Sequence, residues 1–382
     1  MPPDDPFGCF VGAPVVLSGQ PGSLTVAIKD NIDVAGLPTG AGLGRPGRVA
    51  ERDALLVHRI RAAGFTVIGK TRMDEIALGA TGENAHHGRT ENPRCPGRSP
   101  GGSSSGSAAA VAAGYCTAAL GTDTLGSVRI PAAYCGLVGL KPTRGLLPMA
   151  GIVALSWTLD HAGIIAGSVE TTARVLAALA GPVPDKSDGP LRIGVPDVLD
   201  TMEMDPATWR IFQQTLRRLE AQGWPVLPCH VSAWDPSATR RAGLLLLEAE
   251  GAVAHEALIS ADDPAMSPAI RRLLLFGRDC GTGRLVRALR LLREVADGLQ
   301  RVLRDHDLLA LPTVPAPAFN WVDGAPANQA DLAAVANFGG YPAISVPIGA
   351  VPDGRPVGLQ LIGQSGADWR LLDAARIVEA LR

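Results

Sequence analysis

Leu24-Thr-Val-Ala-Ile-Lys29 is the stretch that indicates the fold class. Its β-branched and aliphatic residues predict a short buried strand that ends at Lys29. A second run of this kind, Phe65-Thr-Val-Ile68, follows an amphipathic stretch at 53–63 that has the apolar spacing of a helix. A strand, a helix and a strand in this order are typical of α/β architecture, so we expect an α/β fold.

The rest of the chain continues the alternation of strands and helices. Patterning predicts further strands at 191–195, 308–313, 343–347 and 357–362, and helices at 207–221, 268–305 and 368–381. Many arginines lie on the polar side of the helices at 207–221 and 268–305, where we expect them to face solvent. The Pro-, Asp- and Gly-rich residues 181–190 are the best linker candidate, although we do not expect them to separate independent domains.

Composition excludes several classes of partner. The 382 residues are 46% hydrophobic, enough for a large core, and 35 basic residues nearly balance 37 acidic ones. Such a chain has no electrostatic preference for nucleic acid or for an anionic membrane surface. Met1-Pro-Pro-Asp-Asp-Pro6 lacks the features of a signal peptide, and no apolar run is long enough to span a bilayer. We therefore expect a cytoplasmic protein with a small, weakly charged substrate.

Cysteine and histidine spacing indicates no metal centre. The six cysteines contain no Cys-x-x-Cys pair, which predicts buried, unpaired thiols instead of a zinc site or a disulfide framework. His86 and His87 are adjacent, so they point in different directions, and no third ligand is spaced to join them.

A serine-rich segment, Pro100-Gly-Gly-Ser-Ser-Ser-Gly-Ser107, leads into the alanine-rich run 108–113. Serines before such a run are typical of a helix N-terminus, where the helix dipole is positive. A flexible Gly/Ser linker is the alternative, but a linker is not expected to run directly into an apolar helix.

The same segment formally matches the Gly-x-Ser-x-Gly elbow of α/β-hydrolases. In that reading Ser104 would be the nucleophile, with Asp160 and His161 as its partners. The elbow requires a strand immediately before it, whereas residues 91–100 contain three prolines and few apolar side chains. The context therefore argues against this reading.

A lysine and two serines form a better candidate for acyl transfer. Lys29 ends an apolar strand, and its burial near serines would lower its pKa toward that of a general base. Asp30 should point to the opposite face of the extended chain. Ser103 lies in the serine-rich segment, and Ser127 in Gly121-Thr-Asp-Thr-Leu-Gly-Ser-Val-Arg-Ile-Pro131. The small residues before Ser127 would let backbone N–H groups of Leu125, Gly126 and Ser127 approach a developing oxyanion.

These segments, in this order and spacing, resemble the amidase signature family over nearly the whole chain. Supporting segments are Met73-Asp-Glu75, Gly82-Glu-Asn84, Gly139-Leu-Lys-Pro-Thr143, Gly340–Pro347 and Pro356-Val-Gly-Leu-Gln360. The resemblance implies that Ser127 is the acylated nucleophile, Ser103 a bridging serine after a cis peptide, and Lys29 the base. It also implies an oxyanion site formed by backbone N–H groups from Thr124, Leu125 and Gly126 to Ser127, with Ser104 near the substrate.

The family resemblance extends to the fold and domain organisation. It implies a single α/β/α domain over 1–382 around a large, mixed, twisted β-sheet flanked by helices. Residues 1–180 would form the catalytic core half. Residues 181–382 would form a variable substrate-side insert together with the C-terminal core strands and helix.

Two positions depart from the family pattern. Leu125 stands where the family usually has glycine, which should narrow the approach to the oxyanion site, and Ser105 replaces a common glycine. The triple serine resembles short indole-3-acetamide-hydrolase-like amidases. Compared with the A-type subunits of amidotransferases, the chain is shorter by about a hundred residues, mostly after residue 180, as judged from the family resemblance.

The expected reaction is hydrolysis of a small linear carboxamide to a carboxylate and ammonia, without a metal or cofactor. Malonamide-like, urea-derived and aryl acetamide substrates remain open, with Trp157 and Phe338 as candidate pocket residues. The expected partner is the small-molecule amide, with neither nucleic acid nor membrane, and the resemblance allows a homodimer. The alternatives are an amidotransferase A-type subunit that supplies ammonia to a partner, and a catalytically silent binding module on the same fold.

Overall fold

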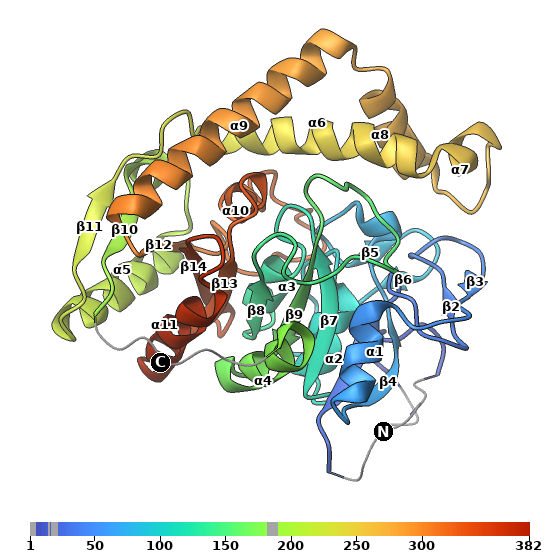
Figure 1. Ribbon diagram of the computed structural model, residues 1–382, viewed down its shortest axis with the longest axis horizontal. Coiled ribbons are helices and arrows are strands. Elements are labelled where there is room, and N and C mark those ends of the chain that lie inside the picture. Colours follow the sequence, from blue (N-terminus) through green and yellow to red (C-terminus); the bar gives the residue numbers. More distant parts are fainter. Residues whose placement is uncertain (1–4, 14–15, 17–21, 182–189) are drawn as a thin grey trace.

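The computed structural model describes residues 5–13, 16, 22–181 and 190–382. In this part of the chain, ten strands form one mixed sheet (Figure 1). Their order across the sheet is β11 (Val226–Cys229), β10 (Ile193–Pro196), β12 (Leu308–Pro312), β14 (Pro356–Gly363), β13 (Ala343–Ala350), β8 (Val138–Lys141), β9 (His161–Ala166), β7 (Ala118–Asp123), β1 (Thr25–Lys29) and β4 (Thr66–Thr71).

Parallel pairing is confined to the two ends of the sheet. β4, β1 and β7 are parallel neighbours, as are β12, β10 and β11, and the strands between them pair antiparallel. β1 and β7 are buried along nearly their whole length, which explains their continuous apolar sequence. The strands from 193–363 extend the sheet begun by the first half of the chain.

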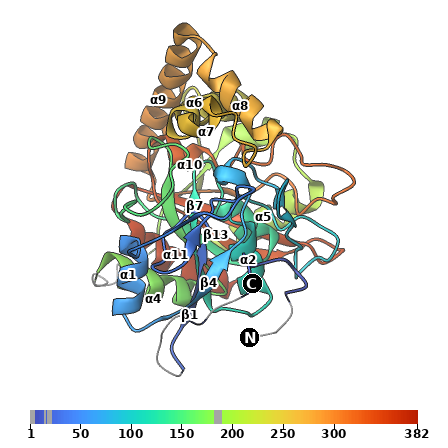
Figure 2. The ribbon, with the colours of Figure 1, turned by 90° about the vertical axis from the view of Figure 1, so that its right-hand side faces the viewer.

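Helices cover both faces of the sheet (Figure 2). One face carries α1 (Leu55–Ala62), α4 (Val169–Ala180) and α11 (Asp368–Ala380), and the other carries α2 (Ser105–Ala112) and α3 (Arg129–Tyr134). α5 (Pro206–Ala221) packs on β11, β12, β13 and β14. The expected α/β/α arrangement around a mixed sheet is therefore present.

A group of helices stands beside this layered core. α6 (Pro236–Ala254), α7 (Glu256–Ser260), α8 (Pro268–Arg278) and α9 (Thr282–Asp305) lie together along one side of the molecule (Figure 1). The short α10 (Val335–Phe338) contacts α6 and α9. The remaining elements are small: β2 (Pro38–Thr39) with β3 (Arg48–Val49), β5 (Glu83–Asn84) with β6 (Gly88–Arg89), and two 3-10 turns, Glu75–Ala77 and Asp197–Thr201.

Most elements predicted from the sequence occur within a few residues of their expected limits. The helix expected over 268–305 is in fact two helices, because the chain between α8 and α9 passes through Gly281 with a positive φ of 79°. Nearly all arginines on α9 are exposed, as expected. Of the linker candidate 181–190, residues 182–189 lie outside the described residues.

The serine-rich segment is not a flexible linker. It begins α2, whose residues from Ser105 to Val111 are all buried against the sheet. A Cβ at Gly106 would lie 2.3 Å from the Cys9 carbonyl oxygen and 2.6 Å from the Arg72 nitrogen, so only glycine allows this approach. Close packing of small residues therefore fixes the position of the serines that precede the helix.

Candidate active site

Two parallel strands bring the candidate residues to one edge of the sheet. β1 ends at Lys29 and its neighbour β7 ends at Asp123, directly before the turn that carries Ser127. The N-terminal end of α2, with Ser103 just before it, lies against the same strand ends through a hydrogen bond from the Ser104 N–H to the Ser127 carbonyl (3.2 Å). The carboxyl ends of parallel strands are where α/β proteins commonly bind ligands.

Lys29 is fully buried and makes short hydrogen bonds to two hydroxyl groups. Its Nζ lies 2.8 Å from Ser103 Oγ and 2.8 Å from Thr122 Oγ1. Burial lowers the pKa of Lys29 to about 7, although Asp74, Asp160 and Asp123 act in the opposite direction. Near neutral pH a large fraction of this amine therefore carries a lone pair that can accept a proton.

Asp30, the next residue, is directed elsewhere. Its carboxylate lies 3.5 Å from the Nζ of Lys70 and accepts a hydrogen bond from the Gly42 N–H (3.4 Å). The expectation that Asp30 faces away from Lys29 is confirmed, so this carboxylate does not directly hold Lys29 in its charged form.

Asp74 supports the backbone around Ser103. The peptide bond between Gly102 and Ser103 is cis, as the resemblance implies, and a Cβ at Gly102 would lie only 2.4 Å from Asp74 Oδ1. The Asp74 carboxyl accepts hydrogen bonds from the N–H groups of Thr81 (2.9 Å) and Gly82 (3.0 Å). Burial raises the pKa of Asp74 to about 6. The carboxyl therefore packs against Gly102 and leaves no room for a larger residue there.

Asp123 organises the turn that carries Ser127. Its carboxylate accepts hydrogen bonds from the N–H groups of Gly126 (2.9 Å) and Val128 (3.2 Å) and pairs with the Arg129 guanidinium (2.8 Å). Burial acts to raise the pKa of Asp123, but the charge and hydrogen bonds of Arg129 outweigh it and hold the pKa well below its usual range. The turn is thus fixed around a permanent anion.

Within this turn, three N–H groups remain free for another acceptor. The N–H groups of Thr124, Leu125 and Ser127 donate to no group among the described residues. The Thr124 hydroxyl donates to Asp160 Oδ1 (2.6 Å), and the other Asp160 oxygen accepts from the N–H groups of Leu155 and Ser156. Asp160 therefore holds the start of the turn in place.

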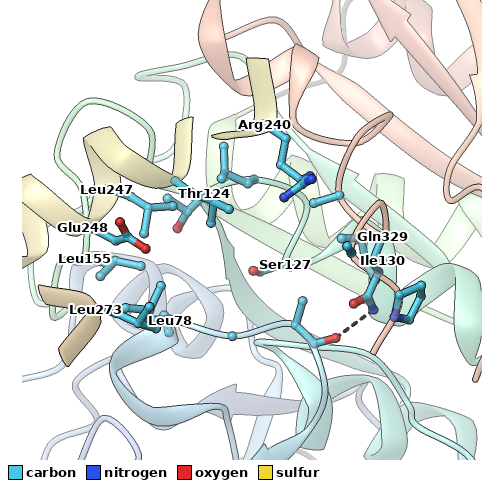
Figure 3. Close-up of a pocket in the computed structure, with 18 residues that line it drawn as sticks. Leu78, Thr124, Ser127, Ile130, Leu155, Arg240, Leu247, Glu248, Leu273 and Gln329 are labelled. Carbon is cyan, nitrogen blue, oxygen red and sulfur yellow. Dashed lines mark hydrogen bonds between the residues drawn. The ribbon is translucent and has the colours of Figure 1, made fainter. Parts of the chain in front are cut away.

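A cavity of about 290 Å³ opens above Ser127 (Figure 3). Most of its lining is apolar, and Arg240 and Glu248 are its charged members. The lining residues are Ala77, Leu78, Gly79, Ala80, Thr124, Leu125, Ser127, Ile130, Leu155, Arg240, Leu244, Leu247, Glu248, Leu273, Pro326, Ala327, Gln329 and Ala330. They come from the segment 77–80, α3 and the turn before it, the loop at residue 155, α6, α8 and the loop at 326–330, so distant parts of the chain build one pocket around the serine hydroxyl.

Comparisons with known proteins identify the family of the chain. A family model described as Amidase matches residues 21–372. The chain belongs to the amidase family. The family model and relatives that are themselves named amidases, one of them from Oryza sativa, identify the protein as an amidase.

Relatives cover nearly the whole amidase chain. The A subunit of glutamyl-tRNA(Gln) amidotransferase from Methanospirillum hungatei JF-1 is 35% identical over 423 residues, covering 99% of this chain and 97% of that protein. The 2-amino-5-chloromuconic acid deaminase of Comamonas testosteroni is 36% identical over 380 residues, covering 94% of this chain and 81% of that protein. A crystal structure of an amidase superposes with a TM-score of 0.87 at 33% identity, covering 94% of this chain and 84% of the other.

These relatives correct one expectation from the sequence. The Methanospirillum protein is covered over 97% of its length, so a deficit of about a hundred residues does not separate this amidase from that amidotransferase component. The comparisons support membership of the amidase family and do not single out the indole-3-acetamide-hydrolase-like branch.

The structure distributes the predicted site residues between two roles. Ser127, Thr124 and Leu125 line the cavity. Ser104 is fully buried and its hydroxyl donates to the Thr122 carbonyl (3.2 Å), and the Gly126 N–H is taken by Asp123. Ser104 and Gly126 therefore hold the turn of the amidase and do not face its cavity.

The candidate aromatic residues do not line the cavity. Trp157 is exposed, and Phe338 is buried beside Gly243, on the far side of Leu125. Their prediction as pocket residues was wrong, because α6 and the 326–330 loop supply the wall that they were expected to form.

The structure does not support the alternative functional sites that the sequence argued against. Residues 91–100 form turns with an isolated bridge at Arg98, so no strand precedes Ser104 as a hydrolase elbow requires. The ring of His161 is buried against the Leu159 carbonyl (2.7 Å). His86 and His87 contact different groups, Glu75 and the Leu43 carbonyl. In the described chain, five of the six cysteines are buried and all are unpaired.

Sequence reasoning missed several residues of the site. Thr122 lies inside a quoted segment, and Asp74 lies in a supporting one, but no role was assigned to either. Arg240 and Glu248 had a detectable signal, since positions 240, 244, 247 and 248 recur at the spacing of one helix face. Among the described helices, none is both long and apolar enough to cross a bilayer.

Proposed function

We propose that the protein hydrolyses a small primary carboxamide to a carboxylate and ammonia through an acyl-enzyme at Ser127. The observation that carries this proposal is the buried Lys29, whose Nζ lies 2.8 Å from Ser103 Oγ and whose pKa is lowered by burial to about 7. The residue after Ser103, Ser104, donates its N–H to the Ser127 carbonyl, and Ser127 lines the cavity.

The proposed proton relay joins the Lys29–Ser103 contact to a proton transfer from the Ser127 hydroxyl to Ser103. A neutral lysine amine has two N–H groups and one lone pair. One N–H donates to Thr122 Oγ1, which leaves the lone pair directed at Ser103 Oγ. Lys29 takes the Ser103 proton as Ser103 takes the Ser127 proton, and Ser127 Oγ then bonds to the amide carbon.

The same groups complete the turnover. The tetrahedral intermediate collapses when Ser103 returns a proton to the amide nitrogen, so the C–N bond breaks and ammonia leaves. A water molecule deprotonated by the same relay then attacks the acyl-enzyme and releases the carboxylate. The free N–H groups of Leu125 and Ser127 are the proposed donors to the negatively charged oxygen.

The cavity supports a compact acyl group with apolar character. Its volume of about 290 Å³ and its wall of leucine, alanine and isoleucine side chains suit an aliphatic chain or a single ring. Aryl acetamides, which the triple serine suggested, remain within this class, as do malonamide-like amides. Urea-derived substrates are less well matched to so apolar a wall.

Ammonia release tests the proposal. We expect one or more amides among indole-3-acetamide, malonamide, glutamine, benzamide, butyramide and acetamide to release ammonia with the wild type, and none with Ser127→Ala. Unchanged release by Ser127→Ala would place the chemistry elsewhere. Labelling of Ser127 by a fluorophosphonate, without turnover of this panel, would indicate an active site with an untested amide.

A second candidate function rests on one observation, the similarity to the A-type component of an amidotransferase along nearly its whole length. In this alternative the ammonia passes to a partner protein instead of solvent. Glutamine would then be the preferred amide, and its hydrolysis would rise when the partner protein is present. Equal turnover of glutamine by the isolated chain and by a stable complex would argue against it.

A further inference from the structure

We propose that Arg240 binds a carboxylate on the acyl side of the substrate, so that the preferred amide is the monoamide of a dicarboxylic acid. This inference rests on the proposed amide hydrolysis, because release of ammonia from a primary carboxamide leaves the acyl group as the part that can extend into the pocket.

The first support is the position of Arg240 on α6. Arg240, Leu244, Leu247 and Glu248 recur along one face of this helix, and all four line the cavity that contains Ser127. Figure 3 shows the Arg240 guanidinium directed into the cavity on one side, with Glu248 on the other. Ser127 thus shares a small apolar space with one arginine.

The second support is the hydrogen bonding of the guanidinium. The Arg240 side chain is only 15% exposed, and its Nε donates to the buried Asp331 carboxylate at 2.5 Å. Its Nη1 and Nη2 donate to no acceptor among the described residues. Neither nitrogen is among the fully buried atoms that lack a hydrogen-bond partner, so both are accessible to donate to a ligand in the cavity that Arg240 lines.

The two free nitrogens of Arg240, Nη1 and Nη2, determine which chemical group can bind there. With Nε held by Asp331, Nη1 and Nη2 form an end-on fork, which matches the two oxygens of a planar carboxylate. Asp331 also fixes the orientation of the fork before a ligand arrives. A fixed fork loses little freedom on binding, so it favours a carboxylate over a neutral group of equal size.

Glu248 determines which end of the pocket receives the acid group. It lies eight residues after Arg240, about 12 Å farther along the helix axis. Its carboxyl has no hydrogen-bond partner among the described residues, and burial raises its pKa to about 7. A substrate carboxylate near Glu248 would meet a carboxyl group that repels it once ionised, whereas one near Arg240 would meet a cation.

The test compares acidic amides with neutral ones of the same shape. The acidic series is succinamate, glutaramate and adipamate, and each is paired with an amide in which an isopropyl group replaces the carboxylate, such as 5-methylhexanamide for glutaramate. For the wild type, we expect kcat/KM to favour the acidic member of at least one pair. In Arg240→Met this preference should fall by roughly 10- to 100-fold, mainly through KM.

Two control variants separate this role from a structural one. Arg241→Met removes the exposed neighbouring arginine, which bonds Ser237, and should leave the preference unchanged. Because Arg240→Met strands the buried Asp331, the double variant Arg240→Met/Asp331→Asn keeps the pocket free of an unpaired charge. It should fold like the wild type and show the same loss of preference. A preference within twofold of the wild type in both Arg240 variants would overturn the inference while leaving amide hydrolysis intact.

Binding of glutarate, measured by calorimetry, decides the inference even if no amide is turned over. Glutarate should bind the wild type and Arg241→Met, and bind the Arg240 variants at least tenfold more weakly. That result in a protein that releases ammonia from none of the amides and is not labelled at Ser127 by a fluorophosphonate would support the carboxylate site and refute the proposed function. Absence of glutarate binding to the wild type, together with no preference for acidic amides, would overturn the inference.

Discussion

At the scale of single residues, the account depends on the protonation state of Lys29. Burial without a neighbouring carboxylate in direct contact lowers the pKa of this amine to about 7, and the nearest polar groups are hydroxyls instead of acids. The protonated Lys29 ammonium cannot accept a proton. The fraction of enzyme with a reactive, neutral Lys29 therefore grows as the pH rises through the pKa of this lysine.

This ionisation predicts the pH dependence of acylation. A lysine with a pKa of about 7 is roughly one-eleventh neutral at pH 6 and ten-elevenths neutral at pH 8, so the rate of Ser127 labelling by a fluorophosphonate should rise about tenfold over this interval. The rate should then level off. In Lys29→Met the labelling should be slower by orders of magnitude at every pH. A pH-independent rate in the wild type would show that Lys29 is not the base.

Leu125 provides a second prediction at this scale. It is 7% exposed, lines the cavity and lies against Gly243 of α6. Leu125→Ala should enlarge the cavity and raise kcat/KM for bulkier amides relative to acetamide. Leu219→Ala removes the same atoms from the buried face of α5, away from the cavity. Both should lose about 2–5 kcal/mol of stability, but a changed substrate profile is expected for Leu125→Ala alone.

At the scale of elements, α6 supplies both charged residues that line the cavity, and Glu250 on the same helix attaches it to the core. The Glu250 carboxylate accepts hydrogen bonds from the hydroxyl groups of Ser156 and Thr158 and from the Thr158 N–H. This loop also leads to Asp160, which holds the turn at Thr124. A side chain outside the cavity thereby links the substrate wall to the oxyanion turn.

Removing the Glu250 hydrogen bonds should make the position of α6 less well fixed. We expect Glu250→Ala to leave three donors without a partner, to destabilise the protein by about 2–4 kcal/mol, and to raise KM more than it lowers kcat. Glu256→Ala, at an exposed position in α7, is the matched control and should leave the stability, KM and kcat unchanged. Equal effects of the two variants on KM would mean that Glu250 does not position α6.

Most helices and strands were predicted from the sequence, whereas the contacts between them were not. Apolar periodicity located β1, β4, α5 and α11, because each buries one face or both. The break at Gly281 was missed because the apolar spacing of the flanking helices outweighed a signal that was present, the glycines at 277, 281 and 283. The role of Thr122 was missed because its hydroxyl meets Lys29 only through the register between β1 and β7, which the sequence does not contain.

At the scale of the whole molecule, Arg129 ties the two halves of the chain around the site. Its guanidinium is fully buried and donates to Asp123, to the Asn337 and Gln360 side chains, and to the Ala333 carbonyl. The acceptors Asn337 and Gln360 lie on α10 and β14, far along the chain from the turn that Asp123 organises. The motif around Ser127 therefore has a structural part as well as a chemical one.

This network predicts the stability of two variants. Arg129→Met should strand the Asp123 carboxylate in the interior and cost about 3–5 kcal/mol. Arg129→Met/Asp123→Asn removes the charge as well and should recover part of the loss. Denaturant unfolding followed by two probes, one for each half of the chain, should give a single transition in the wild type. Separate transitions for the two halves would contradict the prediction of one domain over 1–382.

Segment order along the chain, through the family resemblance, was enough to predict the α/β/α fold, whereas the catalytic roles of Lys29, Ser103 and Ser127 stay predictions. The cavity was not predictable, because its walls come from α6, α8 and the 326–330 loop, which meet Ser127 only in three dimensions. Substrate recognition by Arg240 follows from that assembly and not from any local motif.

The most direct test of the central claim is the identity of the acylated residue. A substrate amide mixed with the enzyme and quenched with acid within milliseconds should leave the acyl group on the peptide that contains Ser127, as identified by mass spectrometry. The adduct should be absent in Ser127→Ala and should accumulate far more slowly in Lys29→Met. An adduct on another residue, or ammonia release at the wild-type rate by Ser127→Ala, would contradict the account.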